Sequence, residues 1–161
     1  MAIVKETIER MNTAPIICVE DDEKDAFLLQ HAFKQADVPN PLVILRDGDA
    51  AMAYLDGSGR YANRAEHPFP ALVLLDLNMT RKSGFDVLHW MRQSACCLSV
   101  PVIVLTSSHY EGDVTRAYAE YANGYLVKPS KPEELLTLVR ALRDFWLMHN
   151  CSPASLDAMP A

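Results

Sequence analysis

Acidic residues directly follow two of the short apolar segments of this sequence. Glu20, Asp21 and Asp22 come directly after the first apolar segment. Asp76 comes directly after the third. Crowded carboxylates repel one another unless a cation or protons intervene. A set of oxygen ligands favours a hard cation, so these residue types indicate a site for Mg²⁺ or Mn²⁺.

Two further polar groups occupy similar positions. The fourth apolar segment leads into Thr106, and the fifth is followed by Lys128. An aspartate held between Mg²⁺ and a lysine ammonium can attack phosphorus in line and become an aspartyl phosphate. The threonine hydroxyl would donate a hydrogen bond to the phosphoryl group. Each residue alone has an ordinary explanation, such as a helix cap or a solvent-exposed lysine. Polar residues of these types after four of the apolar segments, in this order, together favour the phosphoryl chemistry.

The elements that must position these residues alternate in type. Five apolar segments, β-branched or leucine-rich, predict strands at residues 16–19, 42–45, 71–75, 101–105 and 125–127. Most of them do not alternate with polar residues, so we expect strands buried on both faces, in a parallel sheet covered by helices. The segments that follow them predict helices at residues 23–36, 49–55, 84–95, 112–121 and 132–149.

Local signals mark several helix starts. Asp22 and Ser83 are predicted N-caps, and residues 130–133 (Ser-Lys-Pro-Glu) predict a capping box with proline in the first turn. The side chains that we expect to face the core from the helix at residues 23–36 are those of Phe27, Leu28, His31 and Ala32.

Five successive β-α units predict a doubly wound α/β fold with a five-stranded parallel sheet. Right-handed crossovers place every carboxyl end of the strands on one edge, where ligands bind in such folds. The acidic residues, the threonine and the lysine would converge there around a shallow pocket. Residues 57–70 form a longer loop than the fold requires. Its Gly-Ser-Gly start (57–59) follows no strand and lacks the lysine of a P-loop, so we expect a turn.

The segments that carry the polar residues resemble the receiver domain of two-component response regulators. They are IICVEDD (16–22), LLDLNM (74–79), PVIVLTSS (101–108) and GYLVKP (124–129). The resemblance implies a flavodoxin-like receiver fold with strand order 2-1-3-4-5. Three more stretches resemble the single-domain regulators that partner phytochrome-type histidine kinases: RDGDAAMAYLDGSGRY (46–61), YANGYLVKPS (121–130) and DFW (144–146).

The resemblance implies a role for each matching residue of the phosphoryl site. Asp76 would be the phosphoacceptor, and Thr106 and Lys128 would bind the phosphoryl group. Tyr125 would be the aromatic switch residue, turned inward when the threonine moves toward the phosphoryl group. The Lys128–Pro129 bond would be cis, a conformation that only about 5–6% of X-Pro bonds adopt.

The resemblance also implies a set of metal ligands. Asp21 and Asp76 would bind the Mg²⁺ (or Mn²⁺) directly, Glu20 would act mostly through water, and Asn78 would contribute its backbone carbonyl. The chain departs from the family pattern at Thr80, where proline is usual, and at Ser83, where an acid is frequent. Both lie beside the phosphoacceptor, so we expect them to affect the rigidity of the loop and the phosphoryl lifetime rather than the chemistry.

The implied function is that of a stand-alone response regulator, a phosphoacceptor switch rather than an enzyme. Its partner would be a histidine kinase such as a bacteriophytochrome. Few residues follow Trp146, too few for a DNA-binding domain, so we expect signalling through protein–protein contacts. The run at residues 145–147 (Phe-Trp-Leu) would either pack back on the domain or form an exposed apolar patch for self-association. In the resembled group, homodimers form through the segments equivalent to the helices at 112–121 and 132–149 and the strand at 125–127.

Two other functions are weighed against this one. A receiver-like scaffold that does not react would lack one of the reactive residues, but Asp21, Asp76, Thr106 and Lys128 are all present. A phosphatase with an aspartate nucleophile would place a second acid two residues after it, where this chain has Asn78, and would carry a cap insertion.

Composition sets the limits of these interpretations. The 161 residues are 50% hydrophobic and 22% charged, which indicates one folded domain and excludes a mainly disordered chain. We expect an extension at residues 1–14, a receiver domain at 15–149 and a tail at 150–161. A net charge of −6 argues against nucleic-acid binding. No apolar run is long enough to span a membrane and no export signal is evident, so we expect a cytoplasmic protein with reduced cysteines.

Overall fold

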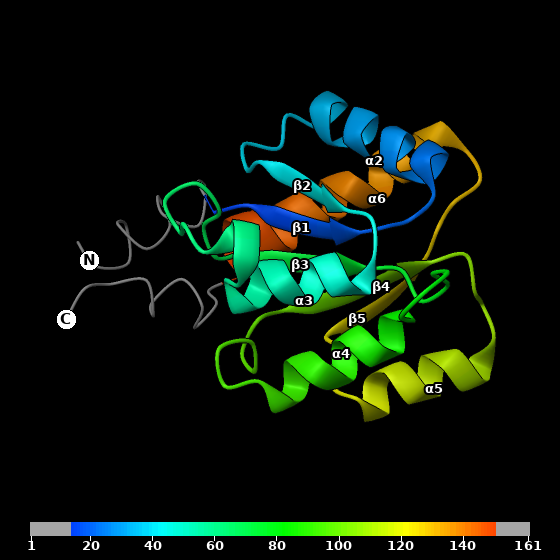
Figure 1. Ribbon diagram of the computed structural model, residues 1–161. Helices are drawn as coiled ribbons and strands as arrows, with labels where there is room; N and C mark the ends of the chain where they lie inside the picture. Colours follow the sequence, from blue (N-terminus) through cyan, green and yellow to red (C-terminus); the bar gives the residue numbers. More distant parts are fainter. Residues whose placement is uncertain (1–13, 151–161) are drawn as a thin grey trace.

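The computed structural model describes residues 14–150, which form a parallel sheet between two layers of helices (Figure 1). The strand order is β2-β1-β3-β4-β5, and every neighbouring pair is parallel. The doubly wound fold and the order 2-1-3-4-5 are therefore confirmed. The strands are β1 (Ile16–Val19), β2 (Leu42–Leu45), β3 (Leu72–Leu75), β4 (Val102–Thr106) and β5 (Gly124–Val127). The predicted extension and tail lie almost wholly outside the described residues, as does Cys151.

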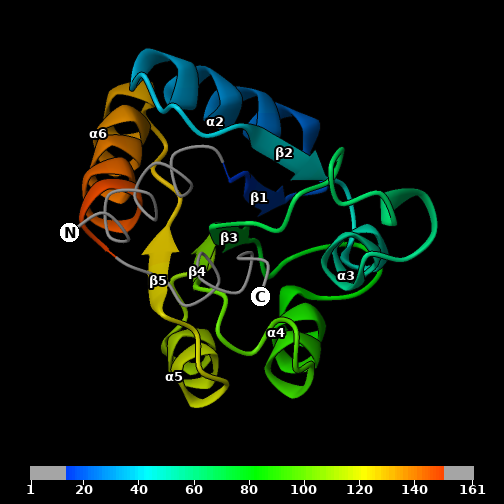
Figure 2. The same ribbon diagram turned by 90° about the vertical axis from the view of Figure 1, so that its left-hand side faces the viewer.

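Helices cover both faces of the sheet. Figure 2 shows α2 and α6 on one face, with α3, α4 and α5 on the other. The five α-helices are α2 (Glu23–Gln35), α3 (Gly48–Asp56), α4 (Gly84–Gln93), α5 (Glu111–Ala119) and α6 (Pro132–Leu142). Each lies within a few residues of its predicted range, except that the last predicted helix changes to π-helical geometry at Arg143–His149. A short 3-10 helix, Gly59–Tyr61, interrupts the long loop after α3. None of the described helices has the length and apolar character needed to cross a membrane.

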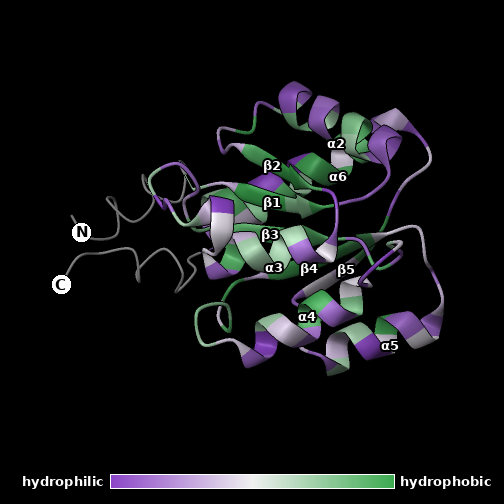
Figure 3. Ribbon diagram, viewed as in Figure 1, coloured by the Kyte–Doolittle hydropathy of each residue, from purple (hydrophilic) through white to green (hydrophobic). Residues whose placement is uncertain are grey.

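The sheet has an apolar core on each face, and neighbouring residues of a strand contribute to opposite cores. Ile17 and Val19 of β1 pack in the core under α3 and α4, whereas Ile16 and Cys18 pack in the core under α2 and α6. This explains why the strand segments are apolar without alternation, and the strands are correspondingly hydrophobic in Figure 3. Cys18 is a buried free thiol.

The buried stripe of α2 differs from the prediction. Phe27 is 66% exposed, His31 is also exposed, and Leu28 is only partly buried against the core. The residues that α2 buries are Ala26, Leu29, Ala32 and Phe33. These continue to the helix end at Ala36, whereas the predicted stripe runs into polar residues after one turn. The sheet therefore takes the longer apolar face of the helix.

Two of the three predicted helix starts are confirmed. The side chain of Asp22 accepts a hydrogen bond from the Asp25 amide at the start of α2. Ser83 and Asp86 form a complete capping box at the start of α4. The capping box predicted at residues 130–133 is wrong, because α6 starts one residue later than that box requires and its N-cap, Lys131, makes no side-chain cap bond.

Candidate functional site

Polar residues are buried where the parallel strands end. Glu20 follows β1, Asp76 follows β3, Thr106 ends β4, and each is at most 6% exposed. Lys128 follows β5 directly. In Figure 1 these carboxyl ends all lie at the right-hand edge of the sheet. The sequence-based expectation that the four strand ends converge is thus confirmed.

The ammonium group of Lys128 is the centre of the site. Its Nζ donates hydrogen bonds to Oε2 of Glu20, to Oδ2 of Asp25 at 2.9 Å and to Oδ2 of Asp76 at 3.0 Å. The lysine side chain is only 14% exposed. A buried ammonium with three carboxylate partners is a fixed positive charge beside the predicted phosphoacceptor.

The predicted cis bond between Lys128 and Pro129 is wrong, since no peptide bond among residues 14–150 is cis. The trans form is the intrinsic preference of X-Pro bonds. With this bond trans, both polar groups of Lys128 have partners. The backbone amide of Lys128 donates to the carbonyl oxygen of Thr106 at 2.7 Å, and the ammonium group donates to the three carboxylates.

Three carboxylates form a cluster suited to a metal ion. Glu20, Asp21 and Asp76 each offer an oxygen, and these oxygens lie within 4.8 Å of one another. An all-oxygen donor set with buried carboxylates fits Mg²⁺ or Mn²⁺ better than a softer metal. The backbone carbonyl of Asn78, the fourth predicted ligand, stays a prediction. Its amide donates to Oδ1 of Asp76 at 3.3 Å.

The charges of the site shift one another's pKa values. Burial raises the pKa of Glu20 from 4.5 to about 7, against the lowering effect of its hydrogen bond with Lys128. Burial alone would lower the pKa of Lys128, but its hydrogen bonds to Glu20 and Asp25 and the charge of Asp76 raise it above its ordinary value. The lysine therefore stays charged at neutral pH. A cation at the carboxylate cluster would favour the ionised form of Glu20.

The start of α4 touches the backbone of Asp76. A Cβ atom at Gly84 would lie only 2.1 Å from the carbonyl oxygen of Asp76, so no larger residue fits there without a shift of backbone. The amide of Gly84 donates to the carbonyl oxygen of Leu77 at 3.0 Å. This close approach fixes where the loop between β3 and α4 begins and ends.

The predicted switch residues, Thr106 and Tyr125, both form hydrogen bonds with Ser108. Thr106 is fully buried, and its Oγ1 accepts from the amide of Ser108 at 3.4 Å. The hydroxyl of Tyr125 donates to the carbonyl oxygen of Ser108 at 2.9 Å. The loop after β4 therefore connects the threonine to the aromatic ring. The switch role of Tyr125 stays a prediction.

Sequence reasoning missed Asp25 as a member of the site. It lies in the first turn of α2, directly after the acidic residues 20–22 that follow β1. This closeness in sequence to the acidic residues was the available signal. Its partner, Lys128, is 103 residues away in the chain.

Comparison with known proteins identifies the architecture. The response regulator receiver domain family matches residues 16–140. The chain belongs to this family. It is 41% identical to Response regulator Rcp1 of Synechocystis sp. (strain ATCC 27184 / PCC 6803 / Kazusa) over 87% of this chain and 93% of that protein. It is 37% identical to the Probable methanogenesis regulatory protein FilR2 of Methanothrix harundinacea (strain 6Ac), over 86% of each.

Solved structures of receiver proteins superpose closely on this chain. The phosphorylated cyanobacterial phytochrome response regulator RcpA has a TM-score of 0.81 at 36% identity, over 88% of this chain and 99% of that one. The Mn²⁺-bound form of Rcp1 has a TM-score of 0.79 at 40% identity, with the same coverage. The receiver therefore resembles phytochrome-linked regulators of two-component signalling, as predicted.

Proposed function

We propose that this receiver is a stand-alone response regulator that accepts a phosphoryl group from a histidine kinase onto Asp76, in a Mg²⁺-dependent reaction. The observation that carries the proposal is the position of the Asp76 carboxylate. Its Oδ2 accepts a hydrogen bond from Lys128 at 3.0 Å, and the same carboxylate belongs to the acidic cluster with Glu20 and Asp21. A carboxylate between an ammonium and a metal site is suited to in-line attack on phosphorus.

Each residue of the site has a separate role in the proposed phosphoryl transfer. An oxygen of Asp76 forms the new O–P bond while the P–N bond of the kinase phosphohistidine breaks, and the imidazole keeps the electron pair and takes up a proton. The ammonium of Lys128 neutralises the charge on the phosphoryl oxygens, and the hydroxyl of Thr106 donates a hydrogen bond to one of them. A metal ion held by Asp21, Asp76 and the neighbouring oxygens supplies further charge neutralisation when bound.

The alternatives fit the site less well. A phosphatase would use a general acid two residues after the nucleophile, and the side chain there is the amide of Asn78, which has no acidic proton to transfer. A scaffold that does not react has no need for a buried ammonium with three carboxylate partners. We therefore propose a switch that acts on its own aspartate rather than an enzyme with a separate substrate.

Intact-mass measurement tests the proposed chemistry. Incubation with acetyl phosphate and Mg²⁺ should add one phosphoryl group, about 80 Da, to the wild-type protein. The gain should disappear without Mg²⁺ and in Asp76→Asn. A wild-type protein that gains no mass from any phosphodonor, or an Asp76→Asn variant that still gains it, would overturn the proposal.

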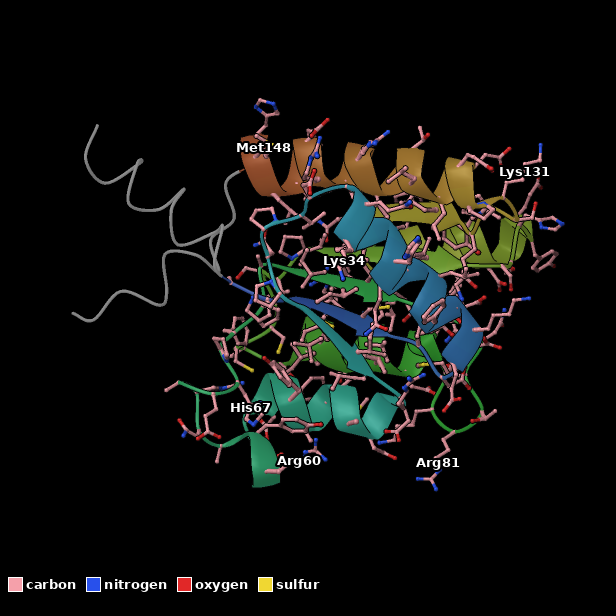
Figure 4. The ribbon with its side chains drawn as sticks, turned by 90° about the horizontal axis from the view of Figure 1, so that it is seen from above. Lys34, Arg60, His67, Arg81, Lys131 and Met148 are labelled. Atoms are coloured by element: carbon pink, nitrogen blue, oxygen red, sulfur yellow. The ribbon has the colours of Figure 1, made fainter. Side chains whose placement is uncertain are left out.

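We propose that the output is a protein–protein contact, with a homodimer formed through α5, β5 and α6. Apolar side chains are exposed on this side, including those of Val127, Phe145 and Met148. A hollow of about 270 Å³ lies between β5 and the α6 region and is lined mostly by apolar residues, among them Leu138 and Trp146. Figure 4 shows Met148 at the far end of this helical region from Lys131, so the patch extends away from the phosphoryl site.

The partner is proposed from the relatives. Similar solved structures include a cyanobacterial phytochrome response regulator and a bacteriophytochrome response regulator, which supports a histidine kinase of that type as the phosphodonor. A cytoplasmic location, without a nucleic-acid or membrane partner, is part of the same proposal. The net charge of −6 supports the expectation about partners, because a negatively charged protein has no electrostatic reason to bind nucleic acid or an anionic membrane surface.

A further inference from the structure

The loop between β3 and α4 makes a contact that depends on an unusual residue of this chain. The backbone N–H of Thr80 donates a hydrogen bond to Oδ2 of Asp21 at 3.0 Å, across 59 residues of sequence. This is the position at which the sequence departs from the proline common in the family. Proline has no N–H and could not donate this bond. The departure therefore adds a donor to the acidic cluster.

The other two carboxylates of the cluster have different donors. Glu20 is held by Lys128 and by the amide of Asp22, and Asp76 is held by Lys128 and by the amide of Asn78. The hydrogen bonds that the Lys128 ammonium donates go to Glu20, Asp25 and Asp76, and not to Asp21. Within residues 14–150, the hydrogen bond from Thr80 is the one that the Asp21 carboxylate accepts.

The donor itself is held in place by the loop around it. The amide of Gly84 closes the loop onto the carbonyl oxygen of Leu77 at 3.0 Å. Ser83 begins α4 with a capping box, and Lys82 forms an ion pair with Asp49 at 2.7 Å. The position of the Thr80 N–H is thus set by the folded loop and does not depend on the threonine side chain.

We propose that the Thr80 backbone N–H is a positioning group for the metal ligand Asp21. By holding Oδ2, it fixes the orientation of the carboxylate in the cluster, where Asp21 would bind the metal ion. It also offsets the repulsion among three carboxylates that a single lysine does not fully neutralise. Hydrogen-bonded partners of metal ligands typically contribute about 10–100-fold to metal affinity. This inference rests on the proposed Mg²⁺ site.

Mn²⁺ affinity, measured by electron paramagnetic resonance of the free ion, tests the inference with a matched pair of variants. Thr80→Pro removes the N–H, and we expect it to weaken Mn²⁺ binding about tenfold. Thr80→Ala keeps the N–H and removes only the hydroxyl, so its affinity should stay within about twofold of wild type. Equal affinities in wild type and Thr80→Pro would overturn the inference, and so would an equal loss in both variants.

A double-mutant cycle separates the hydrogen bond from a change in loop stiffness. If Thr80 acts through Asp21, then Thr80→Pro should cause no further loss of Mn²⁺ binding in an Asp21→Ala background. A further tenfold loss in that background would show that the proline acts on the loop itself and would overturn the inference.

A measurement on the wild-type loop covers the case in which Thr80→Pro does not fold. The Thr80 amide proton should shift upfield in the NMR spectrum of Asp21→Ala, because it loses a charged acceptor. An unshifted amide would contradict the contact. A wild-type protein that binds no Mn²⁺ at all would instead overturn the proposed function.

Discussion

Glu20 connects the charge of the site to the stability of the fold. Its pKa rises from 4.5 to about 7, mainly through burial, so the folded protein holds a proton that the unfolded chain has released in this range. The free energy of unfolding therefore falls as pH rises from about 5 to about 7.5, by up to about 1.4 kcal/mol per pH unit. Urea unfolding in EDTA across this range measures the slope.

Two controls isolate Glu20 as the cause. Glu20→Gln cannot titrate, so its free energy of unfolding should vary less across the same pH range. Glu66→Gln, in the exposed loop after α3, should keep the wild-type slope. A wild-type stability that is flat between these pH values, or rises, would show that burial does not hold a proton on Glu20.

The cysteines should differ in reactivity according to their burial. Burial raises the pKa of the Cys18 and Cys97 thiols well above the ordinary value, whereas Cys96 is exposed. The thiolate is the reactive form. In a Cys151→Ser background at pH 8, iodoacetamide should modify Cys96 quickly and the two buried thiols only after denaturation. Peptide mapping after a short incubation decides this, and early labelling of Cys18 would contradict the buried strand.

At the scale of helices, two similar serines should have different effects on stability. Ser83 caps α4 in a full capping box, and its replacement by alanine should cost about 1 kcal/mol. Ser130 precedes α6, where no side-chain cap bond forms at the N-cap Lys131, so Ser130→Ala should change the free energy of unfolding by less than about 0.5 kcal/mol. Chemical denaturation of both variants measures the difference. Equal losses would mean that α6 has a serine cap after all.

The sequence predicts those elements well whose signals are local. Strand positions follow from apolar runs that need burial on both faces, and the cap at Ser83 follows from four adjacent residues. The buried face of α2 was harder to predict, because Phe27 and Leu28 compete with Leu29 and Phe33 and the packing against the sheet and α6 decides between them.

The same limit applies to the site. Residues at strand ends were predictable because the parallel topology brings those ends together. Asp25 and the Thr80 amide were not predicted as parts of the site, because each joins it through a single contact to a residue more than 50 positions away. Such contacts depend on the path of a loop or the rotation of a helix, which the residue pattern alone does not fix.

At the scale of the molecule, the phosphoryl site and the proposed dimer face share an element. Lys128 follows β5 directly, and Tyr125 within β5 contacts Ser108 in the loop that follows Thr106. The outer side of β5 and α6 carries the exposed apolar patch. A change at the phosphoryl group could thus reach the patch through β5 alone, by a shift between two arrangements of that strand and its loop.

The dimer face is testable with two phenylalanines of similar exposure. Phe145 is 56% exposed beside the hollow at α6, and Phe27 is 66% exposed on α2. If α5, β5 and α6 form the interface, then Phe145→Ala should weaken dimerisation about tenfold or more, as expected for a buried aromatic anchor. Phe27→Ala should leave the dimer unchanged, because α2 lies outside this interface. Sedimentation equilibrium of both variants measures the dissociation constants. A dimer weakened by Phe27→Ala and not by Phe145→Ala would move the interface to α2, and β5 would then no longer connect the site to the partner subunit.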